Sequence, residues 1–253
     1  MRLLAIVLAL VLSVAAHAQS RLDEIVSRGS LRVGLTGDYR PFSQRDKDTG
    51  AFSGLDVDMA RSLSDSLGVK AEFVPTTWAN LLPDLAAGKF DIGMGGISIT
   101  LTRQRAAYFS APVLRVGKTP IARCVDKDKF DTLAEIDRPG VKVIVNPGGT
   151  NEKFDRANLR QAEIVPFPDN TKIFDELAAG HADLMITDSV ETKLQQKLHP
   201  MLCAIHPDQP FDFGELGYML PRDEAWRQYV DLWLRITRES GVWATLLDTY
   251  LGQ

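Results

Sequence analysis

The feature that most constrains the fold of this chain is an internal repeat. Residues 85–92 have the sequence LAAGKFDI, and residues 177–184 have the sequence LAAGHADL. Each copy contains the end of an apolar helical segment, a glycine that can terminate it, and an apolar segment typical of a buried strand. The two copies lie 92 residues apart, which is about the length of one small α/β lobe. The repeat therefore predicts two lobes built on the same plan.

Strand-like and helix-like segments alternate along the remainder of the chain. Helical periodicity is expected at 56–67, 78–87, 171–179, 223–239 and 242–251, with further helices beginning near Gly149 and Ser189. Apolar segments of strand length lie at 31–35, 71–75, 90–94, 141–145, 164–167 and 182–187. This alternation predicts an α/β fold with mostly parallel sheets covered on both faces. A ligand cleft is expected where the carboxyl ends of the strands of both lobes meet.

Two segments are expected to carry the chain between the lobes, at 115–121 and at 213–218. The first lobe would then contain residues 19–116 and 217–253, and the second lobe would contain residues 117–216. Two crossings form a hinge, and a hinge permits the lobes to close around a ligand.

The N-terminus has the pattern of a secretory signal peptide. Met1 and Arg2 precede an apolar run at 3–16 and the small-residue ending Ala16-His17-Ala18. The run is short for a membrane span, and no other segment approaches that length. We expect cleavage after Ala18 and export of a soluble protein to the periplasm, without membrane insertion. The alternative is a buried N-terminal helix.

Composition limits the partners and cofactors of the chain. The formal net charge is −4, whereas proteins that bind nucleic acid are normally basic, so we expect no nucleic-acid partner. The only cysteines are Cys124 and Cys203, and an oxidising compartment would permit a disulfide between them, the alternative being two free thiols. The histidines are scattered, so neither a metal nor another cofactor is expected.

Several short motifs resemble a known family. LRVG at 31–34, YRPF at 39–42, GLDVD at 54–58, FDI at 90–92, TLTR at 100–103 and YFSAP at 108–112 resemble the polar amino-acid-binding proteins of transport systems. GDYRPF at 37–42, GKTP at 117–120, NPGGTNEKF at 146–154, TDSVE at 187–191 and LCAIHP at 202–207 resemble the exported cyclohexadienyl dehydratases more closely.

The resemblance implies a fold and an activity. The fold would be that of the type II periplasmic binding proteins, with two α/β lobes and a double-crossing hinge. The dehydratases of this kind convert prephenate to phenylpyruvate, or arogenate to phenylalanine, with loss of water and carbon dioxide and without a cofactor. The expected partner is therefore a small-molecule substrate. The sequence does not indicate which of the two is preferred, nor the oligomeric state.

Arg103 and Lys118 are the candidate cations for the substrate carboxylates. A guanidinium can hold a carboxylate by two parallel hydrogen bonds, and in the binding-protein relatives the position matching Arg103 does so, assisted by a hydroxyl that matches Ser98. A dianionic substrate favours a second cation, and Lys118 lies on the expected hinge. The alternatives are a surface arginine and a solvated lysine.

The segment around Gly149 is a candidate anion-binding turn. Gly149, Thr150 and Asn151 lie where a strand leads into a helix, and free amide groups at a helix start attract anions. Asn146 is expected on the same wall. The alternative is a plain glycine-rich turn in which Thr150 caps the helix.

Asp188 and Glu191 are the candidates with the greatest consequence for function. An aspartate followed three residues later by a glutamate at a helix start also fits a capping box, so the two interpretations stay open on the residues alone. The resemblance implies that Asp188 holds a ligand amino group in transport relatives and that Glu191 is the general acid in the dehydratases. A helix start lowers the pKa of such a glutamate, whereas closure and nearby carboxylates raise it, and we expect the rise to prevail.

Tyr39 and Trp78 are expected to sandwich the substrate ring, with Asp38 as a weaker candidate that orients the ring hydroxyl or a water. Core packing is the alternative for the two aromatic residues. The competing function is that of a non-catalytic binding protein for an amino-acid importer. Asp188 supports that alternative, whereas Glu191 and the segment at 146–154 favour the enzyme.

Overall fold

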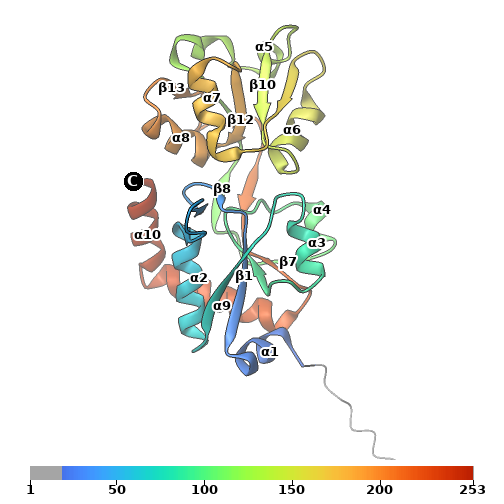
Figure 1. Cartoon of the computed structure of the whole chain (residues 1–253), viewed down its shortest axis with the longest axis vertical. Coiled ribbons are helices and arrows are strands. Elements are labelled where there is room, and N and C mark those ends of the chain that lie inside the picture. Colours follow the sequence, from blue (N-terminus) through green and yellow to red (C-terminus); the bar gives the residue numbers. More distant parts are fainter. Residues whose placement is uncertain (1–18, 253) are drawn as a thin grey trace, which may run out of the picture.

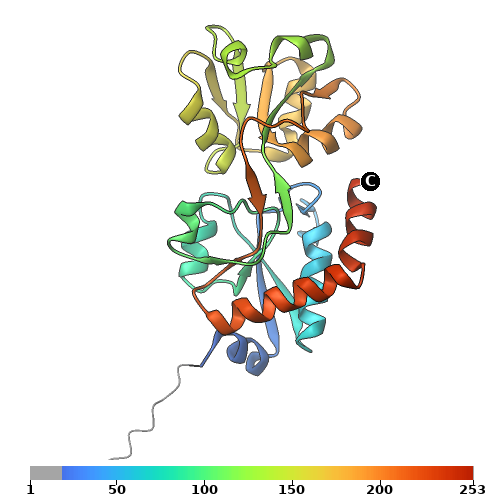
Figure 2. The same cartoon turned by 180° about the vertical axis from the view of Figure 1, so that it is seen from behind.

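A computed structural model describes residues 19–252 of the chain, so the expected signal peptide lies outside the described residues. Two α/β lobes are stacked along the longest axis of the molecule, as Figure 1 shows. Seen from behind, two chain segments run between the lobes, one in each direction (Figure 2). Among the described residues, no helix is long and apolar enough to cross a membrane.

The first lobe is built on a five-stranded sheet with the order β5-β1-β6-β15-β7. Its strands are β1 (Ser30–Leu35), β5 (Lys70–Pro75), β6 (Ile92–Gly93), β7 (Tyr108–Phe109) and β15 (Met219–Leu220). Its helices are α1 (Arg21–Arg28), α2 (Leu55–Ser66), α3 (Leu81–Ala86), α4 (Leu101–Gln104), α9 (Glu224–Glu239) and α10 (Val242–Leu251). A small antiparallel sheet of β2 (Asp38–Tyr39), β3 (Ser43–Arg45) and β4 (Phe52–Ser53) follows β1.

The second lobe repeats this plan with a sheet in the order β11-β10-β12-β9-β13. Its strands are β9 (Lys118–Arg123), β10 (Lys142–Val145), β11 (Glu163–Pro166), β12 (Leu184–Asp188) and β13 (Leu202–Ala204). Its helices are α5 (Leu133–Ile136), α6 (Thr150–Asn158), α7 (Ile173–Ala179) and α8 (Ser189–Leu198), with 3-10 turns η1 (Cys124–Lys129) and η2 (Asn170–Lys172). A disulfide joins Cys124 to Cys203 and ties η1 to β13.

The repeat in the sequence occupies equivalent places in the two lobes. In each copy a helix, α3 or α7, ends near a glycine with positive φ, +67° at Gly88 and +82° at Gly180. The chain then enters β6 or β12, and each of these strands pairs in parallel with the first strand of its α/β unit, β1 or β10. The similar sequences thus build the same helix–strand corner twice.

The lobes are joined by an antiparallel pair of strands, β8 (Leu114–Val116) and β14 (Gly214–Leu216). Gly117 follows β8 where the chain enters the second lobe, and a Cβ there would lie 2.3 Å from the carbonyl oxygen of Asp212. Only a glycine allows the two crossing segments to approach this closely. We propose that the lobes divide at about residues 116–117 and 216–217, next to this pair.

The structure corrects some of the expected element bounds. The helix expected at 78–87 begins only at Leu81, so Trp78 lies in a turn, and the helix expected at 171–179 is divided into η2 and α7. The sheets contain parallel strands at their centres, but β9, β13 and β15 pair antiparallel. Strands β9 and β15 follow directly on the crossing strands β8 and β14 and run opposite to the other strands of their sheets, whereas β13 is antiparallel only to its neighbour β9.

Candidate active site

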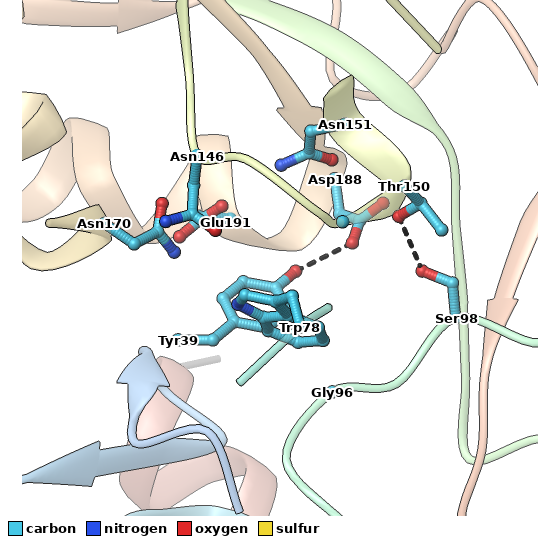
Figure 3. Close-up of a pocket in the computed structure, with 11 residues that line it drawn as sticks. Tyr39, Trp78, Gly96, Ser98, Asn146, Thr150, Asn151, Asn170, Asp188 and Glu191 are labelled. Carbon is cyan, nitrogen blue, oxygen red and sulfur yellow. Dashed lines mark hydrogen bonds between the residues drawn. The ribbon is translucent and has the colours of Figure 1, made fainter. Parts of the chain in front are cut away.

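A small cavity of about 30 Å³ lies between the lobes. Figure 3 shows its lining residues, which come from both lobes. They include nine of the expected site residues: Tyr39, Trp78, Ser98, Asn146, Gly149, Thr150, Asn151, Asp188 and Glu191. Three expected residues, Asp38, Arg103 and Lys118, are not part of this wall but lie directly behind it.

Asp188 is held by residues of both lobes. It ends β12, and its Oδ2 atom accepts a hydrogen bond from the Tyr39 hydroxyl at 2.9 Å (Figure 3). Its Oδ1 atom lies 2.7 Å from the Lys118 ammonium. Although Asp188 is the N-cap residue of α8, its side chain makes no capping hydrogen bond. The capping-box interpretation is therefore wrong for this pair of residues.

Glu191 is an almost fully buried acid on the first turn of α8, with only 2% of its surface exposed. Its Oε2 atom accepts a hydrogen bond from the Thr187 hydroxyl at 2.6 Å. Burial raises the pKa of Glu191 to about 8, and the charge of Asp188 adds to this rise, while the Thr187 hydrogen bond and the charge of Lys118 oppose it. A carboxyl group with this pKa is mostly protonated at neutral pH, so it has a proton to donate.

Lys118, the first residue of β9, is buried behind the cavity wall. Besides its ion pair with Asp188, its ammonium donates to the Thr150 hydroxyl at 3.2 Å and to the side-chain oxygen of Asn151. Asn151 in turn donates to the Thr187 hydroxyl at 2.9 Å. A continuous hydrogen-bonded series therefore leads from the lysine to Glu191 through Asn151 and Thr187. The alternative of a solvated lysine is wrong.

The turn from β10 to α6 brings backbone amides to the cavity. Gly149 is the N-cap residue of α6, and Thr150 is the first helical residue, so Thr150 does not cap the helix. Its hydroxyl instead lies 3.1 Å from the Ser98 hydroxyl of the other lobe (Figure 3). The first amides of a helix have no partner within the helix and point toward the preceding turn, where an anion can accept from them.

Arg103 is buried rather than exposed, which excludes the surface alternative. Its guanidinium donates to the carbonyl oxygen of Ser98 at 2.8 Å, so it supports the segment that carries the Ser98 hydroxyl. Burial lowers the pKa of Arg103 to about 10, with the charge of Asp188 opposing the shift. The guanidinium thus stays charged at neutral pH, one residue away from the cavity wall.

Tyr39 and Trp78 form an aromatic wall of the cavity, with ring centroids 5.9 Å apart. The Trp78 indole donates to both carboxylate oxygens of Asp38, at 3.0 and 3.1 Å. Asp38 therefore positions Trp78 and faces a neighbouring cavity instead of this one. Opposite the aromatic wall, Asn146 donates its amide to the carbonyl oxygen of Pro168 at 3.2 Å.

Two lining residues were not expected from the sequence, Gly96 and Asn170. A Cβ at Gly96, where φ is +73°, would lie 2.6 Å from the ring of Tyr39, so only glycine leaves room for this ring. The Gly95-Gly96 pair after β6 was the available signal. Asn170 donates to the backbone oxygen of Asp38 at 2.9 Å across the cleft, and no local pattern marks it. Among the described residues, no group of histidine, cysteine, aspartate or glutamate is arranged to hold a metal ion.

Residues 31–253 match the bacterial extracellular solute-binding proteins, family 3. Among curated proteins, the chain is 56% identical over 245 residues to a cyclohexadienyl dehydratase of Pseudomonas aeruginosa, which covers 96% of this chain and 91% of the relative. It is 30% identical over 189 residues to an L-cystine-binding protein of Escherichia coli, which covers 74% of this chain and 70% of that protein.

Solved structures give a consistent result. An ancestral amino acid-binding protein, described as a precursor of cyclohexadienyl dehydratase, is 37% identical with a TM-score of 0.84 over 92% of this chain and all of its own. An ancestral cyclohexadienyl dehydratase is 52% identical with a TM-score of 0.59, over 93% of this chain and 98% of that one. The fold is therefore that of the two-lobed amino-acid-binding proteins.

Proposed function

The chain belongs to family 3 of the bacterial extracellular solute-binding proteins, and we infer that within this family it is a cyclohexadienyl dehydratase, a carbon–oxygen lyase. The dehydratase relative matches almost the whole chain at much higher identity than the transport protein does. The observation in the structure that supports catalysis is a buried acid, Glu191, on the wall of the cavity between the lobes, where burial raises its pKa to about 8.

The substrates that we propose are prephenate and arogenate. Each has a cyclohexadienyl ring with a hydroxyl group and a ring carboxylate, and each becomes aromatic when both groups leave. The electron pair of the carboxylate C–C bond enters the ring as carbon dioxide departs, and the C–O bond to the hydroxyl breaks as that oxygen receives a proton. Aromatisation drives the reaction, so the protein has to orient the ring and supply the proton.

We propose that Glu191 protonates the departing hydroxyl. Its burial keeps the proton on the carboxyl group at neutral pH, and Thr187 occupies one carboxyl oxygen, which leaves the other for the substrate. Asp188, three residues before it, is instead paired with Lys118. In many active sites two neighbouring carboxyl groups have different surroundings, which give them different pKa values and different roles.

The substrate carboxylates require positive groups, and we propose that three features provide them. The Thr150 and Asn151 amides lie at the start of α6, and both residues line the cavity. Arg103 lies behind Ser98, and Lys118 lies behind Thr150. Each cation therefore lies one hydrogen bond away from a residue of the cavity wall, Ser98 for Arg103 and Thr150 for Lys118. Tyr39 and Trp78 would hold the ring against this charged wall.

The test is to incubate the purified protein with prephenate at neutral pH and follow phenylpyruvate. We expect turnover by the native protein and at least about a hundredfold lower kcat for Glu191→Gln, because removal of a placed acid costs roughly a hundred- to ten-thousand-fold. Native turnover should also fall as the pH rises through about 8, where Glu191 loses its proton. Glu163→Gln, on the exposed start of β11, is the matched control and should keep native kcat. Unchanged turnover by Glu191→Gln would remove this residue from its role.

The alternative of an amino-acid carrier is favoured by one observation, the carboxylate of Asp188 on the cavity wall. Such a group could hold an amino group of a ligand. A thermal-shift panel of amino acids would detect this activity, and a carrier would bind one of them tightly without turnover.

We also propose that the protein is exported to the periplasm after cleavage behind Ala18. The family is extracellular by its description, and the disulfide between Cys124 and Cys203 suits an oxidising compartment. The mass of the protein recovered from the periplasmic fraction would establish whether the mature chain begins at Gln19.

A further inference from the structure

A dehydratase of this kind consumes a proton in each turnover, so its acid must be reprotonated before the next one. Prephenate enters as a dianion, and phenylpyruvate leaves as a monoanion together with carbon dioxide and water. The proton that completes the water comes from Glu191, which is left as a carboxylate. This need for a proton rests on the proposed function.

We propose that Glu191 regains its proton through a second cavity that approaches it from the side of α8, along Gln195 and His199. This cavity has a volume of about 320 Å³ and is separate from the cavity that would hold the substrate. Glu191 and Asn170 line both cavities. The acid therefore faces the substrate on one side and this passage on the other.

The residues of α8 that line the passage are spaced so that they form a row along it. Glu191, Gln195 and His199 lie at intervals of four, so they occupy one face of the helix and its end. At a rise of about 1.5 Å per residue, His199 lies about 12 Å from Glu191 along the helix. Gln195 is buried, and its amide can both donate and accept hydrogen bonds. His199 is partly exposed, and an imidazole can donate a hydrogen bond at one ring nitrogen and accept one at the other.

The outer end of the passage is open to solvent and charged. Arg40, Lys172 and Asp175 line it and are exposed, and the Nδ1 atom of His199 lies 3.9 Å from an Asp175 oxygen. A water occupies about 30 Å³ in the liquid, so a cavity of this size has room for a hydrogen-bonded series of waters. In this closed arrangement of the lobes Glu191 is too buried to exchange directly with bulk solvent.

Asn170 lies at the inner end of the passage. Its amide nitrogen is fixed by the backbone oxygen of Asp38, while its buried Oδ1 atom has no hydrogen-bond partner among the described residues. A buried acceptor without a partner costs free energy unless water reaches it. Because Asn170 lines both cavities, this residue lies where the passage meets the site.

The experiment measures the first turnover and the later turnovers separately by stopped flow, in Gln195→Leu and His199→Ala. Because burial raises the pKa of Glu191 to about 8, we expect the resting protein to hold its proton at neutral pH, and the first equivalent of phenylpyruvate should form at the native rate in both variants. Later turnovers should be roughly a hundredfold slower, which is the lower end of the range for loss of a proton-transferring group. Added imidazole should accelerate only the slow phase of His199→Ala, and deuterium oxide should slow it further.

His181→Ala is the matched control, because His181 is an exposed histidine that pairs with Glu176 away from both cavities. It should show no burst and native turnover. Two results would overturn the passage: Gln195→Leu and His199→Ala that turn over linearly at the native rate, or a slow phase that responds to neither imidazole nor deuterium oxide. Absence of any phenylpyruvate from the native protein would instead refute the proposed dehydratase activity, so the two failures can be told apart.

Discussion

Buried carboxyl groups in this protein differ in the number of hydrogen bonds that they receive. Asp188 receives hydrogen bonds from Tyr39 and Lys118, and Glu191 receives one from Thr187. Asp155 of α6 is equally inaccessible, yet neither of its carboxyl oxygens has a hydrogen-bond partner among residues 19–252. Burial raises the pKa of Asp155 to about 8, with Lys118 opposing the shift. The fold therefore keeps this side chain neutral at a cost in stability.

We predict that Asp155→Asn flattens the dependence of stability on pH. Below the usual aspartate pKa of 3.8, Asp155 is protonated in both the folded and the unfolded protein. As the pH rises from there to about 8, only the unfolded state ionises, so the folded state loses stability throughout this window. The free energy of unfolding of the variant, relative to the native protein, should be higher at pH 8 than at pH 5 by at least about 1 kcal/mol.

Chemical denaturation at the two pH values measures this difference. Asp65→Asn, at an exposed position of α2, is the control and should follow the native pH dependence. If the stability of Asp155→Asn depends on pH as the native stability does, the pKa of Asp155 is not raised in the folded protein.

At the scale of elements, the turn from β10 to α6 is a part of the second lobe that approaches the first lobe tightly. Gly148 has φ of +89°, and a Cβ there would lie 3.0 Å from the Cβ of Ala79 and 3.1 Å from its amide nitrogen. Ala79 belongs to the turn that carries Trp78. The glycine thus permits two turns that each carry site residues to meet across the cleft.

We predict that Gly148→Ala impairs closure of the lobes, in addition to the strain that any side chain causes at a positive φ. A side chain at positive φ costs roughly 1–2 kcal/mol anywhere, but at Gly148 it also meets the opposite lobe. Gly140 has φ of +87°, and a Cβ there would have no atom within 4 Å, so Gly140→Ala carries the backbone cost alone. The kcat/KM of Gly148→Ala should fall about tenfold below that of Gly140→Ala, which is the loss expected for about 1.4 kcal/mol. Equal values for the two variants would contradict a tight contact in the reactive state.

At the scale of the whole molecule, the structure is a closed arrangement of two lobes on a hinge. Contacts between side chains that span the cleft include Tyr39 with Asp188, Ser98 with Thr150, and Lys47 with Asp169. The ancestral dehydratase superposes less well on this chain than the ancestral binding protein does, in spite of its higher identity. A rotation about the hinge lowers such a score while each lobe keeps its fold.

We predict that the double variant Tyr39→Phe, Ser98→Ala populates the open form more than the native protein does. It removes two hydrogen bonds between the lobes, each worth about 1 kcal/mol, and leaves the hinge strands unchanged. Small-angle scattering should give a larger radius of gyration, and KM should rise about tenfold. Tyr229→Phe removes a hydrogen bond of the same type within the first lobe, to Ser66, and should change neither quantity. An unchanged radius of gyration in the double variant would show that other contacts hold the lobes together.

Local sequence determined most of the elements and the plan of the fold. The repeat at 85–92 and 177–184 predicted two similar lobes because a glycine after an apolar helix specifies the same corner wherever it occurs. Helix α10 lies at Val242–Leu251, as its apolar periodicity predicted. Residue type also indicated the chemistry. A glutamate after a strand can serve as an acid, and a glycine-rich turn before a helix can bind an anion.

The tertiary structure decided what each of these side chains does. The spacing of Asp188 and Glu191 fitted a capping box equally well, and only contacts with Tyr39 and Lys118, which lie far away in the sequence, excluded it. Asn170 entered the site through a hydrogen bond across the cleft that no local pattern reveals. Propensity and periodicity act over a few residues, whereas burial, and with it the pKa of Glu191, depends on how the two lobes meet.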